Sequence, residues 1–196
     1  ICVGESMTFT DLSFPNIVSR IWIFGDGDTS YGNFDIHTYQ IAGTYNATLI
    51  VTDNNGCSNS AANTVLVNPL PIADFIGNPQ NTTILNPLIE FTDQSDAPSP
   101  YSIISWNWDF NDSDSSQETN PTHEYADTGT YLVSLEIINE FGCIDTVIHQ
   151  IIIDPGGFDL FIPKAFTPNN DEHNELFVIK GRYIIDFNIK IFNRWG

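Results

Sequence analysis

The sequence repeats itself at a fixed spacing of 86 residues. The residues shared by the two copies are Trp22, Phe24, Asp26, His37, Tyr39, Gly43, Thr44, Tyr45, Leu49, Gly56 and Cys57 in the first, and Trp108, Phe110, Asp112, His123, Tyr125, Gly129, Thr130, Tyr131, Leu135, Gly142 and Cys143 in the second. So many identities at one spacing indicate two copies of one module within 1–155. Tandem repetition favours spacing or display over catalysis, since a catalytic site is needed only once.

A repeat unit of this length can bury a hydrophobic core of its own. We therefore expect two complete domains, module one at 1–68 and module two at 69–155, followed by part of a third domain at 156–196. Residue usage favours strands and turns over helices, because Thr, Ile, Val, Phe, Asn, Asp and Gly are common and Lys plus Arg number only 6.

Alternation with a period of two predicts the strands. In the second half of module one, Tyr45, Ala47, Leu49 and Val51 alternate with residues expected on the opposite face, and module two repeats this pattern from Tyr131. Further strands are expected at 6–10, 18–24, 35–39 and 64–67. Turn residues recur between these segments, as in antiparallel sandwiches. The pattern predicts an all-β fold with two tandem sandwiches.

The strong negative charge excludes several classes of partner. Twenty-five acidic residues against 6 basic ones give a formal net charge of −19, which repels nucleic acids and anionic membrane surfaces. The acidity fits either a solvated surface or the recruitment of divalent cations. No apolar run is long enough to span a membrane. Because the first residue is Ile1 and no signal sequence follows, we expect the sequence to begin inside a longer product.

An acidic turn at 24–28 lies between two expected strands. Its glycines can take positive φ, and the Asp26 carboxylate can cap backbone N–H groups. In module two Asn111 stands at the place of the first glycine, which is tolerable because Asn enters the left-handed region readily. The turn is interpreted as a self-capped hairpin, with Ca²⁺ binding by Asp26 and Asp28 as the alternative.

The repeated aromatic residues and histidines are interpreted as structural. His37 and His123 have no second His or Cys at ligand spacing, which favours a hydrogen-bonded role. The hydroxyls of the repeated tyrosines can fix a loop to the start of a strand. Trp22 and Trp108 are expected at the centres of the two cores, and stacking on a sugar ring is the alternative.

Taken together, these motifs resemble the polycystic-kidney-disease (PKD) repeat. They comprise Trp-Ile-Phe-Gly-Asp-Gly at 22–27, His-Thr-Tyr at 37–39 and Gly-Thr-Tyr at 43–45, with Asn-Pro-Thr-His at 120–123 in module two. The resemblance covers nearly all of 1–155. It implies immunoglobulin-like sandwiches of secreted or surface proteins that act as non-catalytic spacers or binding modules, sometimes attached to extracellular carbohydrases and proteases.

Three cysteines leave at least one unpaired within this sequence. Cys2 lies seven residues before Phe9, and Ile84 lies seven before the corresponding Phe91. We expect a Cys2–Cys57 disulfide and a buried Cys143 thiol near Ile84, which would place the protein outside the reducing cytoplasm. The alternative is that all three are small buried hydrophobic residues.

The segment after Pro155 breaks the repeat. Its Pro and Gly residues at 155–157 indicate a linker, and alternating residues at 176–179 and 184–192 predict strands of an incomplete third sandwich. Phe-Thr-Pro-Asn at 166–169 and Phe-Asn-Arg-Trp-Gly at 192–196 resemble the gliding-motility-associated C-terminal domain of Bacteroidetes surface proteins. That resemblance implies a sorting domain recognised by the type IX secretion machinery.

The loop of this last segment departs from the family pattern. Asn170 and Glu172 take the places of two usual glycines, and Glu175 takes that of an Asp. Oxygen atoms of Asn169, Asp171, Asn174 and Glu175 are candidate Ca²⁺ ligands, with a metal-free Asx-capped turn as the alternative. No cofactor is otherwise expected.

The leading functional hypothesis is a non-catalytic part of an exported cell-surface protein. Its modules would space or mediate contacts with glycans or proteins, and its last domain would direct type IX secretion. One alternative is the accessory tail of a secreted carbohydrase or protease, and another is a stalk. The sequence has no nucleophile elbow, zinc helix or phosphate loop. Exposed aromatic residues, with Tyr101 and Phe141 as candidates beside the two tryptophans, would favour sugar binding, and the longer loop at 94–105 of module two is a candidate partner contact.

Overall fold

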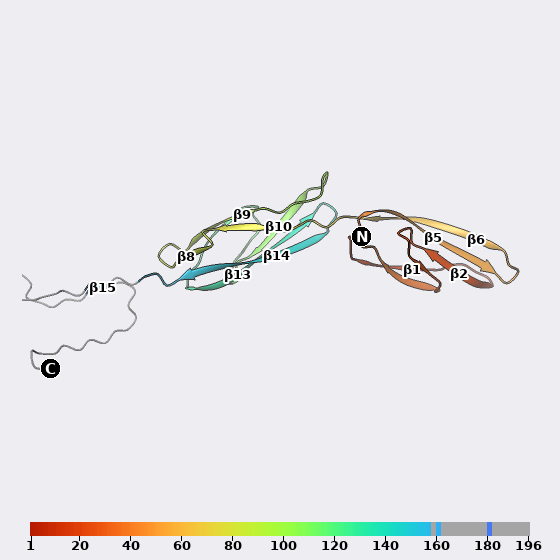
Figure 1. Cartoon of the computed structure of the whole chain (residues 1–196), viewed down its shortest axis with the longest axis horizontal. Coiled ribbons are helices and arrows are strands. Elements are labelled where there is room, and N and C mark those ends of the chain that lie inside the picture. The colour runs from red at the N-terminus through yellow and green to blue at the C-terminus, as the bar shows by residue number, and fades with distance from the viewer. Residues whose placement is uncertain (158–159, 162–179, 182–196) are drawn as a thin grey trace, which may run out of the picture.

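Two antiparallel β-sandwiches lie end to end in the computed structural model, which describes residues 1–157, 160–161 and 180–181 (Figure 1). These residues form strands and no helix, which confirms the all-β prediction. Module one, in red to orange, lies at one end, and module two, in yellow to blue, follows it. The described residues contain no helix that could cross a membrane.

Module one consists of a four-stranded sheet and a two-stranded sheet. The larger sheet has the order β3-β2-β5-β6, and β1 pairs with β4 in the smaller one. The strands are β1 (Ser6–Thr10), β2 (Ile17–Ile23), β3 (Thr29–Ser30), β4 (Phe34–Thr38), β5 (Gly43–Asp53) and β6 (Ser58–Val67). β6 is longer than its apolar alternation predicts, because its polar first half continues the backbone ladder with β5.

Module two repeats this plan and has two further strands. Its sheets have the orders β11-β10-β13-β14-β8 and β12-β9-β7. The strands are β7 (Phe75–Asn78), β8 (Asn81–Thr83), β9 (Leu88–Asp93), β10 (Ile103–Asp109), β11 (Ser115–Ser116), β12 (Thr122–Glu124), β13 (Gly129–Asn139) and β14 (Ile144–Asp154). β8 runs parallel to β14, and at the corresponding place in module one Cys2 forms a single parallel bridge with Asn68.

Each module has its own hydrophobic core. The core of module one is built around Phe9, Trp22, Phe24 and Tyr39, and that of module two around Phe91, Trp108, Phe110 and Tyr125. The indole N–H of Trp22 donates to Gly32 O, and that of Trp108 donates to Glu118 O. Both tryptophans are therefore buried with their polar atoms satisfied, which removes them as stacking platforms for sugars.

Little of the segment after module two is described. The two-residue strands β15 (Leu160–Phe161) and β16 (Lys180–Gly181) pair in antiparallel fashion. The strands expected at 176–179 and 184–192, and the loop with Asn169, Asp171, Asn174 and Glu175, lie outside the described residues.

The disulfide joins the two modules, so the expected Cys2–Cys57 pairing is wrong. Cys2 bonds to Cys143, with 5.7 Å between their Cα atoms, and Cys57 is free and exposed. Cys2 lies beside Asn68, whereas Cys57 lies beyond the opposite end of the β5–β6 ladder. A ladder of that length spans about 30 Å, far beyond the reach of a disulfide.

The expected neighbourhood of Cys143 and Ile84 is also wrong, because β14 separates them. Cys143 precedes this strand, and Ile84 N donates to Asp154 O at its far end. Hydrogen bonding also shows that Thr83, not Ile84, corresponds to Cys2, since Thr83 pairs with Asp154 as Cys2 pairs with Asn68. Counting back from Phe91 fails because Thr83 lies eight residues before Phe91, whereas Cys2 lies seven residues before Phe9. Module two thus has one additional residue in this interval.

Candidate functional site

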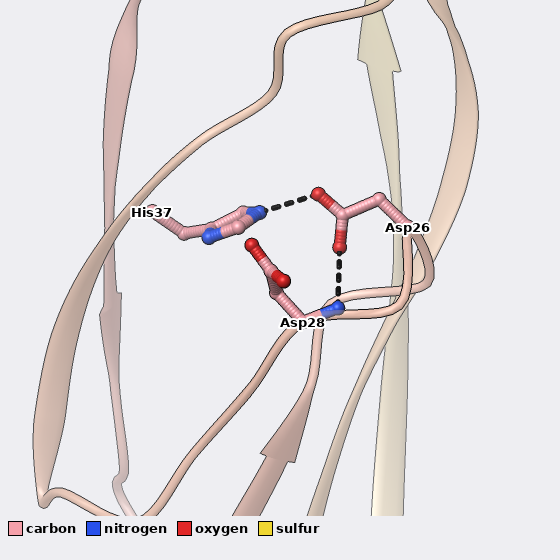
Figure 2. A group of neighbouring side chains, drawn as sticks. All are labelled: Asp26, Asp28 and His37. Carbon is pink, nitrogen blue, oxygen red and sulfur yellow. Dashed lines mark hydrogen bonds and ion pairs between the residues drawn. The ribbon is translucent and has the colours of Figure 1, made fainter.

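The acidic turn between β2 and β3 forms a compact cluster with a histidine of β4. Phe24 N donates to Asp28 O at 3.1 Å and closes the hairpin. Gly25 and Gly27 have φ of 92° and 110°, which L side chains rarely adopt. The turn thereby brings the Asp26 carboxylate toward His37, as Figure 2 shows.

Asp26 uses both carboxylate oxygens within its own module. Its Oδ1 accepts the backbone N–H of Asp28 at 3.1 Å, and its Oδ2 lies 2.7 Å from Nε2 of His37 (Figure 2). The His37 ring stacks on Phe24 with 4.0 Å between ring centroids and meets Tyr39 edge-on. The imidazole thus links the turn to the core of module one.

A pair of tyrosines anchors the other side of this cluster. Tyr39 is fully buried, and its hydroxyl donates to Phe24 O at 3.0 Å. Tyr45 stacks on Tyr39, and its hydroxyl donates to Ile41 O at 2.8 Å. Each hydroxyl thus holds a loop or turn against a strand.

Module two reproduces the arrangement with different turn residues. Asp112 contacts His123 Nε2 at 2.6 Å and the backbone N–H of Asp114 at 3.1 Å. Asn111 and Ser113 adopt φ of 64° and 86° in place of the two glycines. Tyr125 OH donates to Phe110 O at 3.3 Å, and Tyr131 OH donates to Asp127 O at 2.9 Å. The geometry therefore survives the loss of both glycines.

Burial and hydrogen bonding shape the titration of these groups. Partial burial works against ionisation of Asp26, but hydrogen bonds from His37 and Asp28 N–H outweigh it and hold its pKa below the ordinary value. Burial, reinforced by the nearby Asp26 and Asp112 carboxylates, raises the pKa values of Tyr39 and Tyr125 above the ordinary value. The cluster favours an ionised aspartate beside neutral tyrosines.

The cluster brings together three groups that can bind metals, twice in the chain. Ligand atoms of Asp26, Asp28 and His37 lie within 4.8 Å of one another, as do those of Asp112, Asp114 and His123. Ca²⁺ takes six to eight oxygen ligands, whereas each cluster offers two carboxylates and an imidazole. Both oxygens of the central aspartate already have partners, so a metal would have to displace the pair with histidine. The side chains alone therefore supply fewer oxygen ligands than Ca²⁺ takes.

The candidate aromatic contacts of module two are partly exposed. Tyr101 and Phe141 meet edge to face, with 4.8 Å between ring centroids. The longer loop holds them together, since Glu140 N donates to Ser102 O at 3.1 Å. Phe141 lies in the β13–β14 turn that also carries Cys143, whereas Tyr101 lies in the loop before β10, so this loop packs against the end of its own module that is bonded to module one.

Sequence reasoning missed the polar side chains at the junction and beside β7. Asn139 is fully buried, and its Nδ2 donates to Pro69 O at 3.0 Å. Asp145 accepts the N–H of Ala73, and His149 Nδ1 lies 3.0 Å from Phe75 O. Module one has Asp53, Asn59 and Asn63 at the matching positions. The residue types at these positions of module two were the available signal for its contacts with 69–75.

The architecture and the repeated Asp-His-Tyr cluster define the class of the protein as a tandem immunoglobulin-like β-sandwich protein. A PKD domain profile matches residues 1–67 and again residues 68–153. The chain therefore belongs to the PKD domain family. A CHU_C type IX secretion signal domain profile matches residues 160–196. Together these matches identify an exported protein, either secreted or displayed at the cell surface, and neither domain type is catalytic.

Several characterised proteins share one PKD domain with this chain. The microbial collagenase of Vibrio alginolyticus is 43% identical over 72 residues, which make up 35% of this chain and 9% of the collagenase. The pre-pro-metalloprotease PrtV of Vibrio cholerae serotype O1 is 44% identical over 61 residues, 30% of this chain and 7% of PrtV. The chain thus spans less than a tenth of the length of either curated relative.

Solved PKD domains are among the similar structures. The PKD1 domain of the V. cholerae metalloprotease PrtV has 28% identity and a TM-score of 0.38, covering 43% of this chain and 98% of that domain. The PKD1 domain of Vibrio anguillarum Epp has 23% identity and a TM-score of 0.40, covering 45% of this chain and 99% of that domain.

Proposed function

We propose that this chain is a stiff, non-catalytic arm of an exported protein. Its PKD modules space the functional part of the protein from its attachment point, and its last domain presents the protein to the type IX secretion machinery. The observation that carries the proposal is the junction, where the Cys2–Cys143 disulfide and the Asn139–Pro69 hydrogen bond join the two modules. A flexible linker would have neither contact.

The buried aromatic residues support spacing over sugar binding. Trp22 and Trp108 lie inside the cores. Tyr101 and Phe141 pack edge to face rather than side by side as a flat platform. The Asp-His pairs hold their own turns, and we infer that the modules need no bound ion.

Titration of the chain with marine and plant polysaccharides, with and without Ca²⁺, tests the spacer role. We expect no saturable binding in either condition. Saturable binding of one polysaccharide that is lost in Tyr101→Ala would overturn the spacer role and establish glycan adhesion.

A second candidate function is an accessory module of a secreted protease or carbohydrase. The PKD domains shared with the Vibrio collagenase and PrtV favour it. Collagen added to the same titration separates this alternative, since binding to collagen would support an accessory role and its absence the spacer.

Export is tested separately in a bacterium with a working type IX system. The full-length protein should reach the medium or the cell surface, whereas a variant lacking residues 156–196 should stay in the periplasm. Equal export of both would show that these residues do not carry the signal.

A further inference from the structure

Strand β7 fills one side of the module two sandwich. It pairs with β9 from Phe75↔Asp93 to Asn78↔Glu90. The Phe75 side chain is buried against Phe91, Trp108 and His149. β7 thus completes the smaller sheet and closes the core of module two.

Module one has a groove at the corresponding place. It has a volume of about 450 Å³ and is lined by β1 together with residues of β2, β5 and β6, among them Phe9, Trp22, Asn63 and Val65. Strand pairing places these four residues where Phe91, Trp108, His149 and Ile151 contact β7 in module two. The groove therefore has the lining of a β7 site.

The exposure of the matching residues agrees with this correspondence. Phe9 is 8% exposed and Leu49 is 8% exposed, whereas Phe91 is 1% and Leu135 is 0% exposed. Among the strands that the structure describes, β1 pairs only with β4 and leaves its other edge open, while β9 pairs on both sides. An open edge beside an apolar groove is a template for one more strand.

We propose that this groove is a strand-acceptor site, filled by an extended segment of the longer polypeptide that leads into Ile1. The segment pairs antiparallel with β1 as β7 pairs with β9. In module two only two residues separate β7 from β8, whose place in module one is taken by Cys2. A segment that leads directly into Ile1 therefore reaches the groove with a short connection, whereas the β7 of a second copy is already paired in its own module.

The lining also specifies the sequence of the occupant. An aromatic residue is needed at the Phe75 position, where it meets the side chains of Phe9 and Trp22. The residue two positions later need not be glycine, because the 2.6 Å contact of a Cβ on Gly77 is with Ile151 Cδ1, and Val65, which stands at that place in module one, lacks this atom.

A peptide with the sequence of residues 72–79 tests the site when it is added to the 196-residue chain. We expect saturable binding with one peptide per chain and slower amide exchange confined to residues 8–11, which match the residues of β9 that pair with β7. A peptide carrying Phe75→Ala should bind at least tenfold more weakly. Absence of binding, or equal binding of the control peptide, would overturn the proposal. Protection of β1 in a dimer without added peptide would also overturn it, because a second copy would then fill the groove.

A second inference rests on the turn that carries Cys57. Asp53 N donates to Cys57 O at 2.9 Å, and Asn139 N donates to Cys143 O at 3.0 Å. In each turn the first side chain accepts the backbone N–H of the cysteine, at 2.9 Å in module one and 3.0 Å in module two. The two turns therefore present their thiols alike, and Cys143 is bonded to Cys2 of the neighbouring module.

The surface around Cys57 is open and combines apolar and polar side chains. A groove of about 480 Å³ runs from Leu12, Phe14 and Pro15 to Cys57. The Phe14 side chain is 88% exposed. In module two, the corresponding end carries Cys143 and Asn139, and it contacts module one through these two residues.

We infer that Cys57 is the attachment point for another PKD-type module of the same polypeptide, whose cysteine stands at the position of Cys2. The two thiols form one S–S bond and lose two protons and two electrons, which a disulfide-bearing thiol oxidant takes up as it is reduced to a dithiol. The chain would then be built by repeating the junction that joins modules one and two.

Peptide mapping of the exported full-length protein without reductant tests this inference. We expect the Cys57 peptide linked to a cysteine peptide from another module, with the Cys2–Cys143 pair as internal reference. Recovery of Cys57 as an alkylated free thiol would overturn the inference, as would a Cys57–Cys57 link between two copies.

Discussion

At the scale of single residues, Asp26 and Asp112 hold their turns through two bonds each. One carboxylate oxygen caps the turn and the other contacts a histidine that packs on the core. Asp28 and Asp114 lie close by, yet the bonds of the cluster do not use their carboxylates. Substituting Asp26 and Asp28 separately, or Asp112 and Asp114, therefore distinguishes a structural role of the cluster from metal binding.

Replacing Asp26 should destabilise module one, and replacing Asp28 should not. Asp26→Ala removes a turn cap and leaves a largely buried imidazole without its partner, which we expect to cost about 1–3 kcal/mol. Asp28→Ala should change the free energy of unfolding by less than about 0.5 kcal/mol. Urea denaturation measures both variants. A similar loss of stability in both variants, together with stabilisation of the wild type alone by added Ca²⁺, would instead indicate a metal site.

The pKa of Asp26 gives this pair a defined pH dependence. The pKa of Asp26 in the folded protein lies below its unfolded value of 3.8. The ionised carboxylate therefore contributes fully to the free energy of unfolding above pH 3.8, and this contribution is lost as the pH falls through the folded pKa. The difference in unfolding free energy between wild type and Asp26→Ala should therefore be constant at mildly acidic pH and shrink below about pH 4. A difference that grows on acidification would contradict this assignment.

At the scale of strands, the repeat and the period of two predicted the sandwich plan. They placed the tyrosine strands well, because one face of each is buried in a core. They missed the polar half of β6, which is held by backbone pairing, and the short parallel strand β8. The cysteine pairing failed because sequence spacing carries no information on which end of a module a residue occupies.

The close approach of β7 to β14 predicts an overpacking effect. Gly77→Ala places a methyl group against Ile151 in a filled core and should cost about 1–3 kcal/mol. Gly157→Ala is a matched control, since its Cβ meets nothing within 4 Å. Adding Ile151→Val should recover part of the loss by removing the Cδ1 atom. Thermal unfolding of the three variants checks this, and a Gly77→Ala protein as stable as wild type would contradict the packing.

At the scale of the whole molecule, the junction turns two modules into one elongated body. The Cys2–Cys143 disulfide and the Asn139–Pro69 hydrogen bond both join residues of the two sandwiches or the segment between them. The high negative charge favours solubility and disfavours nucleic acid, so an extended acidic arm suits display outside the cell. Family resemblance predicted the export segment, whereas the covalent junction emerged only from the structure.

The most direct test of the stiff arm is the relative orientation of modules one and two by NMR residual dipolar couplings. The oxidised chain and Cys57→Ser should fit a single alignment tensor for both modules. Cys143→Ser, which breaks the junction and leaves both cores intact, should require two different tensors. Two tensors in the oxidised wild type would contradict the account, because the modules would then move independently.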